Sequence, residues 1–131
     1  MRVVPDTSIW IEFFRRGSDQ SADELDRLLR EDSVLLCGPI LAELLAGAPD
    51  EHRTELWLAL GSLPWIDLDH AGWREAGELA HALRRRGHSV PLLDLIIAVA
   101  CARAEAVLWT RDRDFERVTE VLPGLELYSE A

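Results

Sequence analysis

The sequence contains no lysine, because all 14 of its basic residues are arginine. This absence excludes chemistry that needs a lysine amine, such as the P-loop, Schiff-base catalysis and the phospho-accepting site of receiver domains. The four histidines show no metal-ligand spacing such as HExxH. We expect these histidines to be surface or helix-end residues.

Long apolar segments and paired cysteines are also missing. No run of about 18 apolar residues occurs, and the N-terminus lacks the basic and apolar regions of a signal peptide, so we expect a cytoplasmic protein without a membrane span. Cys37 and Cys101 lie far apart in apolar surroundings and form no CxxC pair. This pattern favours buried, reduced thiols over a disulfide.

The net charge of −10 argues against a protein that coats nucleic acid through a broad basic face. It does not exclude nucleic acid as a substrate, because carboxylates that hold metal ions add to the negative charge. The 131 residues, 48% of them hydrophobic, suit one domain with a packed core. We therefore expect a single domain over residues 1–131.

Short β-branched or apolar runs alternate along the chain with segments of helical spacing. The runs predict strands at 3–4, 33–37, 65–68, 106–109 and 125–128. The spacing predicts helices at 9–16, 21–31, 39–46, 51–60, 70–86, 92–104 and 111–118, with a capping box at Ser21–Glu24 and with Trp73 sharing the apolar face of Ala76, Ala80 and Leu83. This alternation predicts a parallel sheet with helices on both faces, in an α/β/α sandwich.

Asp6 follows the first strand directly and is followed by Thr7 and Ser8. An aspartate there lies at the carboxyl end of a strand, where open α/β sheets bind ligands. The same residue types are preferred helix N-caps, and capping by Asp6 or Ser8 would stabilise the helix by about 1 kcal/mol. For Asp6 alone, capping is the simpler interpretation.

Glu43 and Asp94 are harder to explain by local structure. Glu43 is flanked by apolar residues, and positions 39, 46 and 47 of its helical stripe are not polar, so the stripe does not resemble a solvated face. Asp94 stands in a helix that is apolar all round and therefore predicted to be buried. A buried charge needs a partner or a cation, because burying it alone costs several kcal/mol. An arginine partner remains an alternative for Asp94.

Asp112 and Asp114 follow the fourth predicted strand, where each could also serve as a helix cap or pair with a neighbouring arginine. All these acids follow a strand or lie early in a helix, so a parallel sheet would bring them to one edge. Two carboxylates about 4 Å apart repel by about 4 kcal/mol at an effective dielectric of 20. A cluster of this kind implies a cation, and an all-oxygen site suits Mg²⁺ or Mn²⁺. Such a site favours phosphodiester hydrolysis by a metal-activated water.

Four motifs, in the order in which they occur along the chain, resemble those of the PIN-domain family, and within it those of the VapC-like toxins of bacterial toxin–antitoxin modules. They are Asp6-Thr7-Ser8, Glu43 in Leu-Ala-Glu-Leu-Leu-Ala-Gly, Asp94 in Pro-Leu-Leu-Asp, and the segment Thr110–Phe115. The resemblance spans nearly the whole chain. It implies a three-layer sandwich around a central, mostly parallel five-stranded sheet, and a Mg²⁺- or Mn²⁺-dependent endoribonuclease. Pro5 departs from the pattern, since an aliphatic residue is commoner there, but the last position of a strand should tolerate it.

The resemblance also implies roles for individual residues. The acidic set would be Asp6, Glu43, Asp94 and Asp112, with Asp114 as a fifth member or a substitute for Asp112. Thr7, Ser8 or Thr110 would hydrogen-bond a ligand carboxylate or a metal-bound water. Arg111 and Arg113 lie beside this site and are candidates for binding substrate phosphates.

The partners implied by the resemblance are an RNA substrate, a cognate antitoxin and a second copy of the chain in a homodimer. An antitoxin of such a pair often inserts a basic side chain into the acidic pocket, which is compatible with the net charge of −10. The alternative is a catalytically silent PIN-like module that binds RNA or protein. A phosphatase of the haloacid dehalogenase type is disfavoured, because it needs Asp-x-Asp where this chain has Asp6-Thr7-Ser8.

Overall fold

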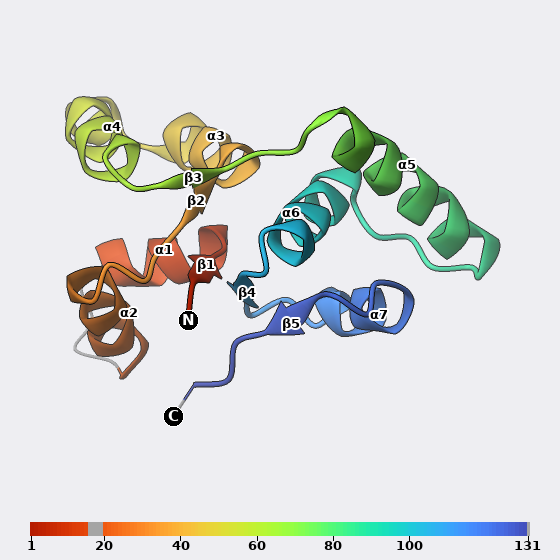
Figure 1. The fold of residues 1–131 in the computed structure, drawn as a ribbon. Helices are drawn as coiled ribbons and strands as arrows, with labels where there is room; N and C mark the ends of the chain where they lie inside the picture. The colour runs from red at the N-terminus through yellow and green to blue at the C-terminus, as the bar shows by residue number, and fades with distance from the viewer. Residues whose placement is uncertain (16–19, 131) are drawn as a thin grey trace.

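The computed structural model describes residues 1–15 and 20–130 (Figure 1). In this part of the chain strands and helices alternate as the sequence predicts. The elements are β1 (Val3–Pro5), α1 (Thr7–Phe14), α2 (Gln20–Arg30), β2 (Leu36–Cys37), α3 (Gly38–Gly47), the 3₁₀ helix η1 (Asp50–His52), α4 (Arg53–Gly61), β3 (Trp65–Ile66), α5 (His70–Arg85), α6 (Leu92–Arg103), β4 (Val107–Trp109), α7 (Asp114–Val121) and β5 (Glu126–Leu127).

The sheet is parallel throughout the described residues, and its five strands fall into two groups. One group has the order β1-β4-β5 and the other pairs β2 with β3. A parallel bridge between Val3 and Val34 joins the two groups, and the amide of Leu35 donates to the carbonyl of Val3 at 2.8 Å. The strands therefore lie in the order β3-β2-β1-β4-β5, which confirms the predicted five-stranded parallel sheet.

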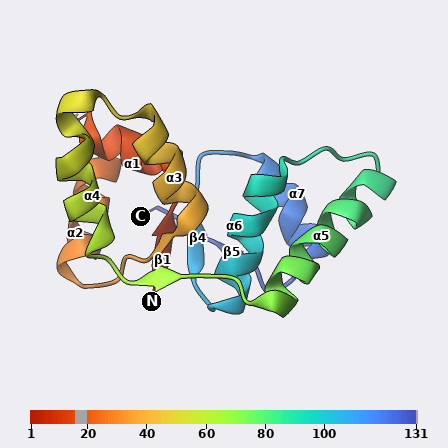
Figure 2. The same ribbon diagram turned by 90° about the horizontal axis from the view of Figure 1, so that it is seen from above.

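Helices pack on both sides of these strands and form the outer layers of the predicted sandwich (Figures 1 and 2). The long helix α5 lies along α6, while α3 packs between α4 and α6. Helix α1 contacts both α2 and α3, and α7 packs against α6. In the described part of the chain, no helix is both long and apolar enough to cross a membrane.

The core is formed by β1, β4 and the inward faces of the helices, and it contains both cysteines. Cys37 and Cys101 are buried and free, as predicted. Burial raises the pKa of the Cys37 thiol to about 11 and that of Cys101 well above its usual value. The predicted inward position of Trp73 is wrong, because its side chain is 53% exposed, whereas Ala76, Ala80 and Leu83 are buried.

Several predicted element boundaries also need correction. Helix α1 begins at Thr7 rather than Ile9, and its predicted end at Arg16 lies outside the described residues. Helix α2 begins at Gln20, so Ser21 is not its N-cap, and the side chain of Ser21 also lies outside the description. Pro5 is the last residue of β1 and lies opposite Trp109. The last position of a strand is where a proline is expected to be tolerated.

Candidate active site

Asp6 lies at the carboxyl end of β1 and is both the N-cap of α1 and a member of the candidate site. Its Oδ1 accepts hydrogen bonds from the Ser8 amide at 3.1 Å and from the Ser8 hydroxyl at 2.6 Å. Its Oδ2 accepts a hydrogen bond from the Thr110 hydroxyl. Because Asp6 caps the helix and Ser8 donates to it, the two interpretations of Asp6 are compatible rather than exclusive.

The loop after β4 is organised by the hydroxyl of Thr110. This hydroxyl donates to Asp6 and also accepts a hydrogen bond from the Asp112 amide at 3.0 Å. The Asp112 carboxylate in turn accepts the Asp114 amide at 2.9 Å, where α7 begins. Thr110 therefore links the end of β1 to the loop that carries Asp112.

Glu43 reaches the same region from the middle of α3. Its Oε1 accepts a hydrogen bond from the Thr7 hydroxyl at 3.2 Å. Glu43, Ala46 and Gly47 are all exposed, so the prediction that this stripe is not a solvated face is wrong. The exposed stripe is lined by small residues, which leaves the Glu43 carboxylate open to the pocket.

Asp94 lies in the first turn of α6 and is half-buried. The helix is not buried all round, because Leu92 and Leu93 in the same turn are exposed, and burial begins at Leu95. Desolvation and the charges of Asp112, Glu43, Asp6 and Asp114 raise the pKa of Asp94 to about 6. Desolvation is the largest cause of the raised pKa of Asp94, and the neighbouring carboxylates add to it.

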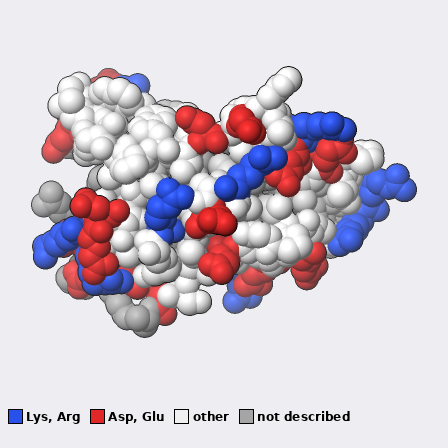
Figure 3. Space-filling view, viewed as in Figure 1, with Lys and Arg blue, Asp and Glu red and all other residues white. Residues whose placement is uncertain are grey.

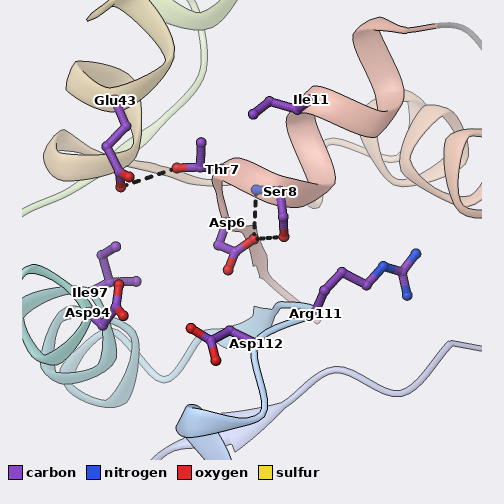
Figure 4. Close-up of a pocket in the computed structure, with 9 residues that line it drawn as sticks. All are labelled: Asp6, Thr7, Ser8, Ile11, Glu43, Asp94, Ile97, Arg111 and Asp112. Atoms are coloured by element: carbon purple, nitrogen blue, oxygen red, sulfur yellow. Dashed lines mark hydrogen bonds between the residues drawn. The ribbon is translucent and has the colours of Figure 1, made fainter. Parts of the chain in front are cut away.

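One pocket of about 420 Å³ is lined by four of the predicted carboxylates, which come from four different parts of the chain. Figure 4 shows these carboxylates arranged around a common space. The residues that line the pocket are Asp6, Thr7, Ser8, Ile11, Glu43, Asp94, Ile97, Arg111 and Asp112. Asp114, Arg113 and Thr110 are not among them, although Thr110 binds Asp6 from the adjoining loop.

The donor set of this pocket suits a hard divalent cation, since it offers carboxylate and hydroxyl oxygens. Mutual repulsion, seen in the raised pKa of Asp94, would be relieved by such a cation. As the side chains stand, no three His, Cys, Asp or Glu residues of the described chain form a ready-made metal-binding group. The chemistry of the residues thus fits a metal ion, while the coordination itself stays a prediction.

Arg111 lines the pocket, but its guanidinium is turned away from the carboxylates (Figure 4). It forms ion pairs with Glu12 of α1 and Glu130 near the C-terminus. Sequence reasoning missed both glutamates, because neither lies near Arg111 in the sequence and each looks like an ordinary surface acid. The charges on the face seen in Figure 3 are likewise mixed, with acidic and basic side chains interspersed.

The sequence model of the PIN domain family matches residues 3–121. The chain belongs to the PIN domain family. It is 35% identical over 124 residues to VapC ribonuclease Mb1587 of Mycobacterium bovis and to ribonuclease VapC11 of Mycobacterium tuberculosis, covering 91% of this chain and 92% of each relative. The family to which the four acidic motifs pointed is thereby confirmed.

Solved structures show the same fold. The chain resembles the VapBC2 structure of Rickettsia felis, bound to a promoter DNA fragment, with a TM-score of 0.77 and 24% identity. It resembles VapBC-1 of nontypeable Haemophilus influenzae with a TM-score of 0.78 and 23% identity. Each alignment covers 98% of both chains. The PIN domain fold therefore extends over nearly the whole length of this chain.

Proposed function

We propose that this chain is a metal-dependent endoribonuclease and the toxin of a toxin–antitoxin pair, acting as one domain in the cytoplasm. The observation that carries the proposal is the pocket in which Asp6, Glu43, Asp94 and Asp112 meet from separate elements. A fold alone does not specify a function, but a site of this composition restricts the chemistry to that of a hard cation. The names of the VapC relatives support RNA as the substrate.

In this proposal the four carboxylates hold Mg²⁺ or Mn²⁺, which when bound would activate water and neutralise charge on a phosphodiester. Asp6 is the best-oriented ligand, because hydrogen bonds from Ser8 and Thr110 fix both of its oxygens. Such orienting contacts typically affect metal affinity or activity by about 10–100-fold. Thr7 orients Glu43 in the same way. Asp112 is the fourth ligand in preference to Asp114, since only Asp112 lines the pocket.

The partners we propose are RNA, a cognate antitoxin and a second copy of this chain. The similar structures from Rickettsia felis and Haemophilus influenzae are VapBC assemblies, which supports an antitoxin partner. The acidic pocket would favour a basic side chain from that partner, because opposite charges attract most strongly where solvent screening is reduced.

The test is cleavage of RNA by purified protein with Mg²⁺ or Mn²⁺, with and without EDTA, alongside Asp94→Asn. We expect cleavage that EDTA abolishes and that Asp94→Asn reduces at least about 100-fold, beyond the range for residues that merely orient ligands. Cleavage that is unaffected by chelation, or equal in the variant, would remove the metal mechanism. Wild-type protein that binds no Mn²⁺ and cleaves no RNA would favour the catalytically silent module.

A further inference from the structure

We propose that Arg111 is a positioning residue, clamped between Glu12 and Glu130, which holds the Thr110–Asp112 loop against α1. The inference deepens the proposed function and rests on it, since the loop carries one of the four carboxylates of the nuclease pocket. It assigns a role to two glutamates that lie outside the pocket lining. It also differs from the expectation that Arg111 binds substrate phosphate.

The clamp is defined by two ion pairs on one guanidinium. The Nε of Arg111 donates to Oε2 of Glu12 at 3.2 Å, and its Nη1 pairs with Oε1 of Glu130. Figure 4 shows the guanidinium pointing away from the four carboxylates. A phosphate in the pocket would therefore compete for this cation with two carboxylates that already bind it.

Contacts that do not involve Arg111 also hold Glu130 and the C-terminal segment in place. The indole N–H of Trp109 donates to Oε1 of Glu130 at 2.7 Å. Tyr128 is fixed just before it, because its amide donates to the Leu108 carbonyl at 2.8 Å and its hydroxyl donates to Glu24 at 2.6 Å. The Glu130 carboxylate thus binds both Trp109 and Arg111, the two residues that flank Thr110 in the sequence.

The clamp and the pocket share the same two segments of chain. Thr110 is bound to the pocket residue Asp6, which caps α1. The next residue of the loop, Arg111, is bound to Glu12, which lies further along α1 and outside the pocket lining. These two links fix the loop relative to α1 at two points. Loss of the Arg111–Glu12 link would therefore leave the Asp112 loop free to rotate about the Thr110–Asp6 link.

The Glu130→Gln variant distinguishes two roles for Arg111, positioning the loop and binding substrate phosphate, because the two roles predict opposite results. If Glu130 supports the loop, the variant lowers Mn²⁺ affinity and kcat. If Glu130 instead holds Arg111 away from substrate, the variant releases the cation and RNA binds more tightly. Glu126→Gln is the matched control, since Glu126 is an exposed acid of the adjacent β5.

The experiment measures Mn²⁺ binding by calorimetry without RNA, and kcat and KM for RNA cleavage, for Glu130→Gln and Arg111→Met. We expect both variants to lower Mn²⁺ affinity and kcat together by about 10-fold, with KM little changed. Arg111→Lys should recover only part of the loss, because an ammonium lacks the planar fork that binds two carboxylates at once. The exposed α7 residue Arg117, changed to Met, controls for loss of a positive charge.

Unchanged Mn²⁺ affinity and kcat in Glu130→Gln, or a rise in KM as the only effect of Arg111→Met, would overturn the clamp. A wild-type protein that neither binds Mn²⁺ nor cleaves RNA would instead refute the proposed function. The support of Glu130 by Trp109, on which the clamp rests, can still be tested in that case through the indole N–H resonance of Trp109 in an NMR spectrum. Glu130→Gln should shift this resonance and Glu126→Gln should not, and an unshifted resonance would contradict the inference.

Discussion

Two pockets open at the carboxyl edge of the same parallel sheet, and they differ sharply in chemistry. The first, beyond β1 and β4, is lined by four carboxylates and two hydroxyls. The second, of about 260 Å³, lies beyond β2 and β3 and is lined mainly by apolar residues such as Ile66, Leu68 and Ile96. The topology supplies both pockets, but only the residue types in the first favour binding a cation.

Helix α6 contributes to both pockets and shows how the contrast arises. Asp94 and Ile97 line the acidic pocket, whereas Ile96 and Ala100 line the apolar one. Neighbouring positions on a helix point in different directions, so a single aspartate in its first turn changes one pocket and leaves the other unaffected. The comparison can be tested by altering one pocket at a time.

The largest effect is expected from Asp6→Asn in the acidic pocket. The change removes a charge whose two oxygens are held by Ser8 and Thr110, and we expect RNA cleavage to fall by at least about 100-fold. The same substitution at Asp67, the charged residue of the apolar pocket, should leave cleavage unchanged. Equal losses in the two variants would show that the pockets do not differ in function.

A smaller effect is expected from Thr110→Val, which keeps the shape of the side chain and removes the hydroxyl. The Asp6 carboxylate loses a donor and the Asp112 amide loses its acceptor. Cleavage should fall by about 10–100-fold, and unfolding by denaturant should show a loss of about 1–2 kcal/mol. Thr119→Val, which removes a hydroxyl bound to a carbonyl within α7, is the control for stability alone. Activity equal to that of the control would exclude an orienting role for Thr110.

The stability of the metal-free protein should depend on the charge of Asp94. The folded-state pKa of Asp94 is about 6, above its ordinary value of 3.8, so its stabilising contribution is complete below pH 4 and is lost as the pH rises through 6. With EDTA present, the Tm should fall between pH 5 and pH 7 by on the order of 3 °C more in wild type than in Asp94→Asn. Mn²⁺ should reverse this loss in wild type. Parallel pH profiles for the two proteins would contradict the electrostatic account.

The smallest effect is expected at Cys37 of the apolar pocket. Burial raises the pKa of this thiol to about 11, so at pH 8 only about one molecule in 1,000 carries the reactive thiolate. Iodoacetamide should leave Cys37 unmodified in the folded protein at pH 8 and modify it in denaturant, as followed by mass spectrometry. Rapid labelling of the folded protein would show that the pocket admits solvent to the sulfur.

Much of the fold could be predicted from local sequence, because buried strand runs and helical stripes leave a clear periodicity. The errors occur where tertiary packing decides the result. Trp73 shares an apolar helical face in sequence but projects beyond the core, and Leu92 and Leu93 at the start of α6 are exposed despite the apolar composition of the helix. Periodicity identifies the face that can be buried, but the neighbouring elements decide how much of it is covered.

The sequence by itself determined the family and the parallel sheet and singled out Asp6, Glu43 and Asp94, since these depend on local patterns and their order along the chain. Only the tertiary structure decided that Asp112 rather than Asp114 lines the pocket. It also decided that Arg111 faces Glu12 and Glu130 instead of the carboxylates that line the pocket. These partners lie 99 and 19 positions away in the sequence, and no local spacing encodes a contact between side chains brought together only by the folded sheet.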